Sequence, residues 1–277
     1  MSNYSNIGFL VDSIKDLQQL ADKVSTIGSH VPGKKGSFIT YSDTSGAELW
    51  LQLNKKNQPV GLAPHFRGIS EMKVCLTSEI KIPNDGLDTT MQAWADPAEL
   101  NNPKSGEFPF AFEVPDGAKY GALQFPQDLT IQLAAFAHEI SYYDDQELYY
   151  AAQGEELVWA VPSFCPAGLF EEHTNHSPAY AHFTGTIKAF KKLKNELTQR
   201  EFYWLLAKTI GGEIDIVVDI NLVEKEPIID GVVQGVFWMS GQLKNEPILS
   251  NLRKKLQKAV NPLAIWQYII NATTKPK

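Results

Sequence analysis

The stretch IGFLVDSIKDLQQLADKV, residues 7–24, changes from a strand pattern to a helix pattern within a few residues. Its first five residues form a short apolar run, which indicates a strand. Asp12 and Ser13 follow, and both residue types are good helix N-caps. Apolar residues then recur at spacings of three and four, which predicts an amphipathic helix of about 13 residues that ends at Gly28.

The residues after this helix predict three more strands. Side chains alternate in SFITYS (37–42) and in AELWLQLN (47–54), and the turn-forming residues 43–46 separate the two runs. A second turn at residues 57–59 leads into VGLAPHF (60–66). The predicted order of the N-terminal region is therefore β-α-β-β-β.

This order resembles one module of the vicinal oxygen chelate family, which includes glyoxalases and bleomycin-resistance proteins. The resemblance rests on residues 7–23 and on YSDTSGAELWLQ (41–52), and it covers less than a quarter of the chain. It implies a cupped sheet on which the family's enzymes bind a divalent metal through His and Glu. The two ligand positions correspond here to Asn6 and Trp50, and neither is a competent ligand for Zn²⁺, Fe²⁺ or Mn²⁺.

Glu48 lies two residues before Trp50 and is expected on the same face of its strand. One carboxylate does not make a metal site, so the resemblance implies a module without metal chemistry. Such a sheet would pack on a partner sheet or hold a small apolar ligand, with Glu48 and Trp50 as candidate ligand-binding residues.

Composition points to a folded protein of one or two domains. The chain has 277 residues, of which 43% are hydrophobic, and two cysteines, which exclude a disulfide framework. No run approaches the roughly 18 apolar residues of a membrane-spanning helix. The N-terminus lacks the pattern of a secretory signal, so we expect a cytoplasmic protein with no membrane partner.

The charge distribution divides the chain into three zones. Residues 1–84 carry a net charge of +2, residues 85–180 carry −14, and residues 181–277 carry +5. The middle zone would repel phosphate at long range, which makes it a poor nucleic-acid surface.

The acidic middle predicts a mixed sheet. Strands are expected at 72–82, 89–96, 108–114 and 157–164, an apolar run at 129–141, and a helix at 142–153. His138 and Glu139 are adjacent in the apolar run and would point to opposite faces, so we interpret His138 as a half-buried structural residue and, at most, a ligand contact.

The segment EEHTNHSP (171–178) contains a cluster of candidate metal ligands. Glu172, His173 and His176 could bind a divalent metal and leave a position open for water, with His138 or His182 as a further ligand. The Thr, Asn, Ser and Pro residues around them favour an exposed polar loop instead. Cys75 and Cys165 have apolar flanks and are expected to be buried, inert thiols. The phosphate-binding, serine-hydrolase, zincin and CxxC motifs are missing.

The last zone suggests a small barrel closed by helices. Four or five strands between residues 182 and 243, with glycines at the bends, resemble an OB-like unit. Aromatic residues alternate with lysines there, as in single-strand nucleic-acid binders, but acidic residues follow and strand aromatics are usually core. Two helices are expected within residues 247–272.

These observations predict an α+β protein with a glyoxalase-like module and acidic mixed sheet (1–180) and an OB-like unit with terminal helices (181–277). The leading functional hypothesis is a non-catalytic module that binds a small molecule or a protein without a cofactor. One alternative is an enzyme that uses a divalent metal at the Glu/His loop. The other is a single-stranded nucleic-acid binder, although nucleic acid is an unlikely partner. The oligomeric state stays open.

Overall fold

We describe the fold from a computed structural model of the chain, which describes residues 2–34, 36–80, 87, 89–120, 123–154, 159–166 and 179–244. The chain divides into two compact units, residues 1–243 and residues 244–277. Only Lys244 of the second unit is described, so the account below concerns the first unit. The predicted helices at 247–272 lie outside the described residues.

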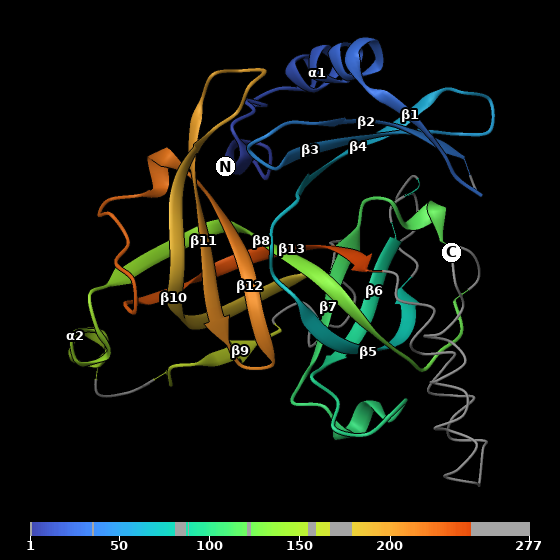
Figure 1. Cartoon of the computed structure of the whole chain (residues 1–277). Helices are drawn as coiled ribbons and strands as arrows, with labels where there is room; N and C mark the ends of the chain where they lie inside the picture. The colour runs from blue at the N-terminus through green and yellow to red at the C-terminus, as the bar shows by residue number, and fades with distance from the viewer. Residues whose placement is uncertain are drawn as a thin grey trace, which may run out of the picture. The chain divides into compact units, whose positions relative to one another are not determined.

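The N-terminal region forms a four-stranded antiparallel sheet with a helix on one face (Figure 1). We call β1–β4 the N-terminal sheet. Its elements are α1 (Ile14–Ile27), β1 (Ser29–Pro32), β2 (Ser37–Ser42), β3 (Ala47–Leu53) and β4 (Pro59–Phe66). The predicted helix and the three predicted strands after it are confirmed, whereas β1 was not expected.

Local capping explains the bounds of α1. The Ser13 hydroxyl oxygen accepts a hydrogen bond from the backbone N–H of Asp16 at 3.2 Å, which satisfies a free donor of the first turn. At the other end, the N–H of Gly28 donates to the carbonyl of Val24 at 2.8 Å. Val24 is buried on the face that packs against the sheet.

The strand predicted at residues 7–11 is wrong. Residues Ser5–Ile7 form a 3-10 turn (η1) that ends at Gly8, whose φ of 85° is left-handed and incompatible with a strand. The carbonyl of Ile7 accepts instead from the Asn195 side chain at 2.8 Å. The apolar run serves another purpose, because Ile7 and Phe9 are buried in a core cluster.

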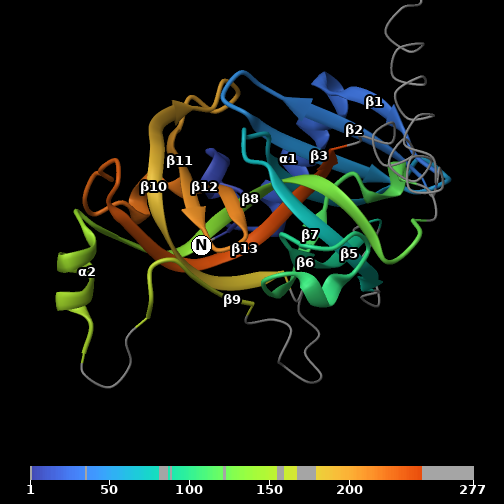
Figure 2. The same ribbon diagram turned by 60° about the horizontal axis from the view of Figure 1, so that its bottom comes forward.

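The remaining strands form one nine-stranded sheet, which we call the barrel body (Figure 2). They are β5 (Met72–Ile80), β6 (Thr89–Ala95), β7 (Pro109–Val114), β8 (Gln127–Tyr143), β9 (Ser163–Cys165), β10 (Tyr180–Lys194), β11 (Glu201–Thr209), β12 (Gly212–Asp219) and β13 (Val232–Lys244). The structure is thus mixed α+β, as predicted, and consists mostly of β-strands.

The barrel body closes on itself twice. One circuit runs β5–β6–β7–β13–β8 and back to β5, and the other runs β10–β11–β12–β8–β13 and back to β10. Both circuits use β8 and β13, which cross the middle of the body in Figure 2 between the two groups of three strands. A five-stranded ring therefore does form in the C-terminal half, but β8 contributes one strand from before residue 180.

The two halves of the body repeat one connectivity. In each half, three consecutive antiparallel strands precede a fourth, and the first strand pairs antiparallel with the fourth (β5 with β8, β10 with β13). The third strand of each half pairs in parallel with the fourth strand of the other half (β7 with β13, β12 with β8). This exchange joins the halves into one sheet, and the contacts divide the chain after Leu243 rather than at residue 180.

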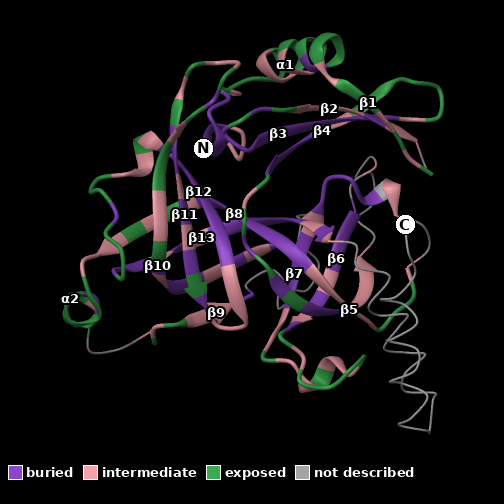
Figure 3. Ribbon diagram, in the orientation of Figure 1, coloured by how far each residue is buried: buried purple, intermediate pink, exposed green. Residues whose placement is uncertain are grey.

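The side chains of β8 alternate between two separate hydrophobic cores. Alternate residues of β8, such as Leu133 and Ala135, lie inside the barrel body, whereas Ala134 and Phe136 face a second cluster shared with the N-terminal sheet. Leu49 and Leu51 of β3 belong to this second cluster. Figure 3 shows β3 and the central strands of the body as largely buried, whereas α1 is mostly exposed.

Two smaller expectations need correction. The helix predicted at 142–153 begins later, as α2 (Gln146–Ala152), because β8 continues to Tyr143 and Asp145 caps the helix through the N–H of Leu148 at 2.8 Å. Of the strand predicted at 157–164, residues 157 and 158 lie outside the described residues, and among the described ones only Ser163 and Phe164 are in a strand, as the start of β9. Within the part of the chain that is described, the helices are too short or too polar to span a bilayer.

Candidate functional site

A buried polar network joins the N-terminal sheet to the barrel body. Glu48 of β3 and His65 of β4 are directly opposite each other in the strand pairing, and their exposed fractions are only 5% and 0%. Their face of the sheet meets polar residues from three strands of the body. We call the set the interlayer network: Glu48, His65, Gln132, Asp215, Ser240 and Gln242.

Asp215 is the fully buried carboxylate of the network. Its carboxylate accepts from the backbone N–H groups of Ile69 at 3.1 Å and Ser70 at 2.8 Å. It also accepts from the Gln132 amide at 2.9 Å and from the Trp204 indole at 2.7 Å. Four donors match the acceptor capacity of one carboxylate, so this fully buried side chain is satisfied without water.

Asp215 also fixes the proton on His65. Because a carboxylate only accepts, the NH₂ of Gln132 must point toward Asp215, and the amide oxygen of Gln132 then faces His65. The His65 Nε2–H donates to that oxygen at 3.0 Å. The other ring nitrogen, Nδ1, therefore accepts from the Ser240 hydroxyl at 2.8 Å.

Burial favours a neutral imidazole at this position. Burial is the main cause that lowers the pKa of His65 below its usual value, and the nearby carboxylates of Glu48 and Asp116 oppose that effect only in part. A neutral ring with one donor and one acceptor fits the two partners that the network provides.

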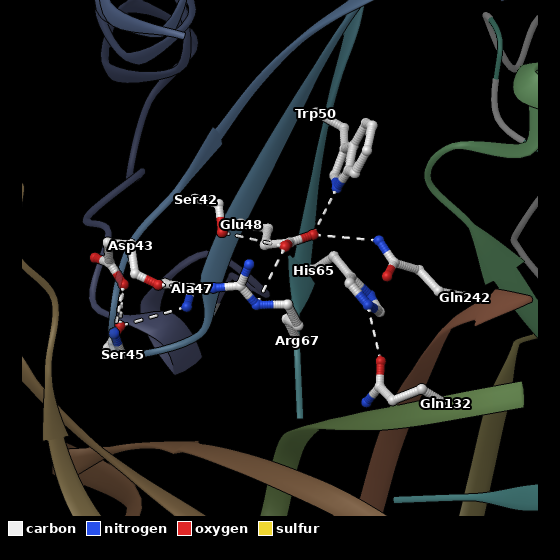
Figure 4. Close-up of polar contacts among 10 residues, drawn as sticks. All are labelled: Ser42, Asp43, Ser45, Ala47, Glu48, Trp50, His65, Arg67, Gln132 and Gln242. Atoms are coloured by element: carbon white, nitrogen blue, oxygen red, sulfur yellow. Dashed lines mark hydrogen bonds and ion pairs between the residues drawn. The ribbon is translucent and has the colours of Figure 1, made fainter. Parts of the chain in front are cut away.

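Glu48 is held from several sides (Figure 4). Its Oε2 accepts from the Trp50 indole at 3.1 Å and from the Gln242 amide at 3.2 Å, and its Oε1 accepts from the Ser42 hydroxyl at 3.2 Å. Arg67 approaches Oε1 at 3.8 Å from the more exposed side. The prediction that Glu48 and Trp50 share a face is confirmed by their direct contact.

A cation covers the ring of Trp50. The Lys119 ammonium lies 4.0 Å from the ring centroid and 3.0 Å from the carboxylate of Asp116, on the turn after β7. Trp50 is itself 5% exposed, so this contact forms part of the junction between the N-terminal sheet and the body.

The Ser240–His65 pair has the elements of a nucleophile and a base. A serine hydroxyl bonded to an imidazole is the arrangement that activates serine for acyl transfer. Here both side chains are fully buried, and the second ring nitrogen is held by an amide rather than a carboxylate. The pair links β4 to β13 through this hydrogen bond.

The structure places the other predicted site residues apart from this network. His138 Nε2 lies 2.8 Å from the side-chain oxygen of Asn3, and its ring packs edge-on against Tyr180. His182 contacts the ring of Trp159 and the amide of Gln234 at 3.2 Å. The prediction that His138 is half-buried is confirmed.

Asn6, the first ligand position that the family resemblance implies, links two strands. Its amide donates to the carbonyl of Ala137 at 3.0 Å and accepts from the N–H of Asp219 at 2.9 Å. Glu172, His173 and His176 lie outside the described residues. Among the residues that are described, no group of three or more His, Cys, Asp or Glu side chains could hold a metal ion.

The aromatic residues considered for nucleic-acid stacking are mostly core. Phe202 and Phe237 are fully buried, and Tyr203 and Trp238 are nearly so. The cysteines differ from each other: Cys75 is buried and its pKa is raised to about 12, chiefly by burial, whereas Cys165 is only half-buried, which corrects the expectation that both are enclosed.

One hollow opens at the free end of the N-terminal sheet. It has a volume of about 280 Å³ and lies between the turn that joins β1 to β2 and the turn that joins β3 to β4. Lys34, Lys55, His30 and Ser37 are among its lining residues. The interlayer network lies elsewhere, since none of its members lines this hollow.

Sequence reasoning missed most of these positions. His65 was not singled out, and neither was Gln132, Asp215 or Ser240. A usable signal was present, because Gln132 in LTIQLAAFA and Asp215 in EIDIVV are polar residues within otherwise apolar strands. Comparison with protein-family models, with curated proteins and with solved structures finds no match for this chain.

Proposed function

We propose that this chain is a non-catalytic binding module and that its N-terminal sheet carries the ligand site. The observation that carries the proposal is the saturation of the interlayer network. Glu48, His65 and Ser240 could serve as acid, base and nucleophile, yet each is buried and bonded within the protein.

The energetic role of the network supports the same conclusion. A buried polar group destabilises the fold unless it is hydrogen-bonded, and a satisfied network defines one arrangement of the layers it joins. The network therefore orients the N-terminal sheet on the barrel body. That sheet presents the exposed hollow at its free end, where a small ligand can reach it.

The glyoxalase-like and OB-like assignments are part of this proposal. A glyoxalase-like module that has lost its metal ligands would keep a sheet able to hold a ligand, and an OB-like barrel would supply a rigid support. The absence of a strand at residues 7–11 is a departure from the glyoxalase-like order, so the binding proposal rests on the network and the hollow rather than on that likeness.

Native mass spectrometry with elemental analysis of the untagged protein tests the proposal. We expect a metal-free chain and a co-purifying small-molecule adduct or, failing that, a thermal shift with a member of a metabolite panel. One metal per chain that a Glu172→Ala or His176→Ala change removes would overturn the proposal in favour of a metal-dependent enzyme. No adduct and no thermal shift would contradict the small-ligand site.

A further inference from the structure

The hollow at the end of the N-terminal sheet is basic. Its lining includes Lys34 and Lys55, from two different turns, and the described residues that line it include no Asp or Glu. Lys56 is exposed in the second turn, and Lys35, which follows Lys34 in the sequence, lies outside the described residues. The site therefore brings at least two positive charges to one small space.

The two lysines of the hollow are not paired with a carboxylate within the described part of the chain, whereas four other lysines are. Lys119, Lys188, Lys192 and Lys225 each form an ion pair with a carboxylate. Neither lysine of the hollow forms an ion pair or side-chain hydrogen bond with any described residue, so both ammonium groups are available to a ligand.

The turns that carry the lysines are well defined. The side-chain oxygen of Asn54 accepts from the N–H groups of Lys56 at 2.8 Å and Gln58 at 3.1 Å, which closes the second turn around Lys55. In the first turn, a Cβ added to Gly36 would lie 2.3 Å from the carbonyl oxygen of Leu53, so only glycine lets this turn approach the end of β3 this closely. The hollow is thus a product of specific packing.

Uncharged donors line the same space. His30 and Asn57 are exposed there, and Ser37 lies at the base of the first turn. The Ser37 hydroxyl is buried and has no hydrogen-bond partner among the described residues. A hydroxyl, an amide and two ammonium groups together suit an oxyanion that accepts several hydrogen bonds at once.

The net charge of −7 does not oppose such a ligand locally. Charges in water at physiological salt are screened over about 8 Å, so charges far from the hollow contribute little to its potential. The volume of about 280 Å³ is at the lower limit of small-molecule sites, which favours a compact group over a long polymer.

We infer that this hollow binds the phosphate group of a small phosphorylated ligand, with Lys34 and Lys55 as its charged contacts. The inference rests on the proposed binding function and names the site and ligand class for it. Phosphate is favoured because two ammonium groups from separate turns can contact different oxygens of one tetrahedral anion.

Calorimetric titration of the full chain with sodium pyrophosphate at low salt tests the inference. We expect saturable binding that weakens as salt rises, and a loss of about tenfold or more in affinity for the Lys34→Gln/Lys55→Gln double variant. The matched control is Lys15→Gln/Lys23→Gln, which removes two exposed lysines of α1 from the same layer and should leave binding unchanged.

Amide chemical shifts provide the second readout and locate the site. Pyrophosphate should perturb residues 30–37 and 54–57, and vesicles that contain a phosphoinositide should perturb the same residues if the phosphate belongs to a lipid headgroup. Either pattern supports the inference and identifies the source of the phosphate.

Three results would overturn it: no pyrophosphate binding at low salt, binding that both double variants retain, or tight binding of a single-stranded oligonucleotide with none of pyrophosphate. If native mass spectrometry also reveals an unphosphorylated adduct, the inference fails while the proposed binding function stands. A stoichiometric metal removed by Glu172→Ala would contradict the proposed function instead.

Discussion

Ser240 donates the hydrogen bond that completes the environment of His65. A Ser240→Ala change would leave the buried Nδ1 atom of His65 without a donor, which costs about 1–3 kcal/mol of unfolding free energy. We expect denaturant unfolding to show a loss of that size. Ser25→Ala is the control, because Ser25 is exposed and its hydroxyl bonds only within α1. Equal stability of the two variants would contradict a structural role for the network.

The protonation of His65 predicts how stability depends on pH. Burial lowers its pKa in the folded chain below the ordinary value of 6.5, so at acidic pH the unfolded chain binds more protons. The free energy of unfolding should therefore be largest above pH 6.5 and should decrease as the pH falls below it.

Measurement of unfolding from about pH 7 to about pH 5 checks this dependence. His138 and His182 also have lowered pKa values because of burial, so they contribute in the same direction. A His65→Gln variant should keep part of the slope and lose the part due to His65. A slope identical to that of the unchanged protein would show that His65 is not buried in its neutral form.

Some of these residues could be found from the sequence, and others could not. The alternation of β3 placed Glu48 and Trp50 on one face, which their contact confirms. The Ser240–His65 contact joins residues 175 positions apart. Periodicity predicts the face on which a side chain lies, but it does not identify the partner strand.

At the scale of elements, Gly68 lies in the link between β4 and β5 and packs closely against the side chain of Asp215. A Cβ at Gly68 would lie 2.0 Å from the Asp215 carboxylate, which already accepts four hydrogen bonds. We expect Gly68→Ala to destabilise the protein by about 1–3 kcal/mol or more, since the carboxylate must move away from its donors.

Gly154 is the matched control for this substitution. A Cβ at Gly154 would meet no atom within 4 Å, so Gly154→Ala should leave the melting temperature nearly unchanged. If Gly68→Ala were equally silent, the close approach of residue 68 to Asp215 would be contradicted.

The helix and strands were predicted well where capping and turn residues fix their ends. Ser13 and Gly28 bound α1 as expected, and the turns around residues 43–46 and 57–59 separate the predicted strands. The strand at residues 7–11 failed because Gly8 is left-handed and because Asn195 and Thr198, from a distant loop, bind the carbonyls of Ile7 and Gly8. Tertiary hydrogen bonds overrode the local preference.

At the scale of the whole described unit, the two layers share one core. Leu49 of the N-terminal sheet, Phe136 of β8 and Trp238 of β13 belong to the same buried cluster. Separation of the N-terminal sheet from the barrel body would expose this cluster to water. We therefore expect residues 1–243 to unfold in a single cooperative transition. Tryptophan fluorescence and far-ultraviolet circular dichroism should give coincident melting curves. Separate transitions would mean that the N-terminal sheet folds independently.

The exchange of strands between the halves could not be predicted from the sequence. β7 pairs with β13, and β12 pairs with β8, although these strands are far apart in the sequence. Hydrophobic patterns identified these strands but carry no information on such distant pairing. The expected division at residue 180 follows from a change in charge, whereas the sheet continues across that point.

The most direct test of the binding proposal is whether Ser240 reacts as an enzyme nucleophile. The folded protein would be treated with a fluorophosphonate, which labels activated serine hydroxyls, and its intact mass would be measured. Since Ser240 and His65 are both fully buried, the account predicts an unchanged mass. A single label on Ser240 that is lost in His65→Gln would contradict it and would identify a serine-dependent enzyme.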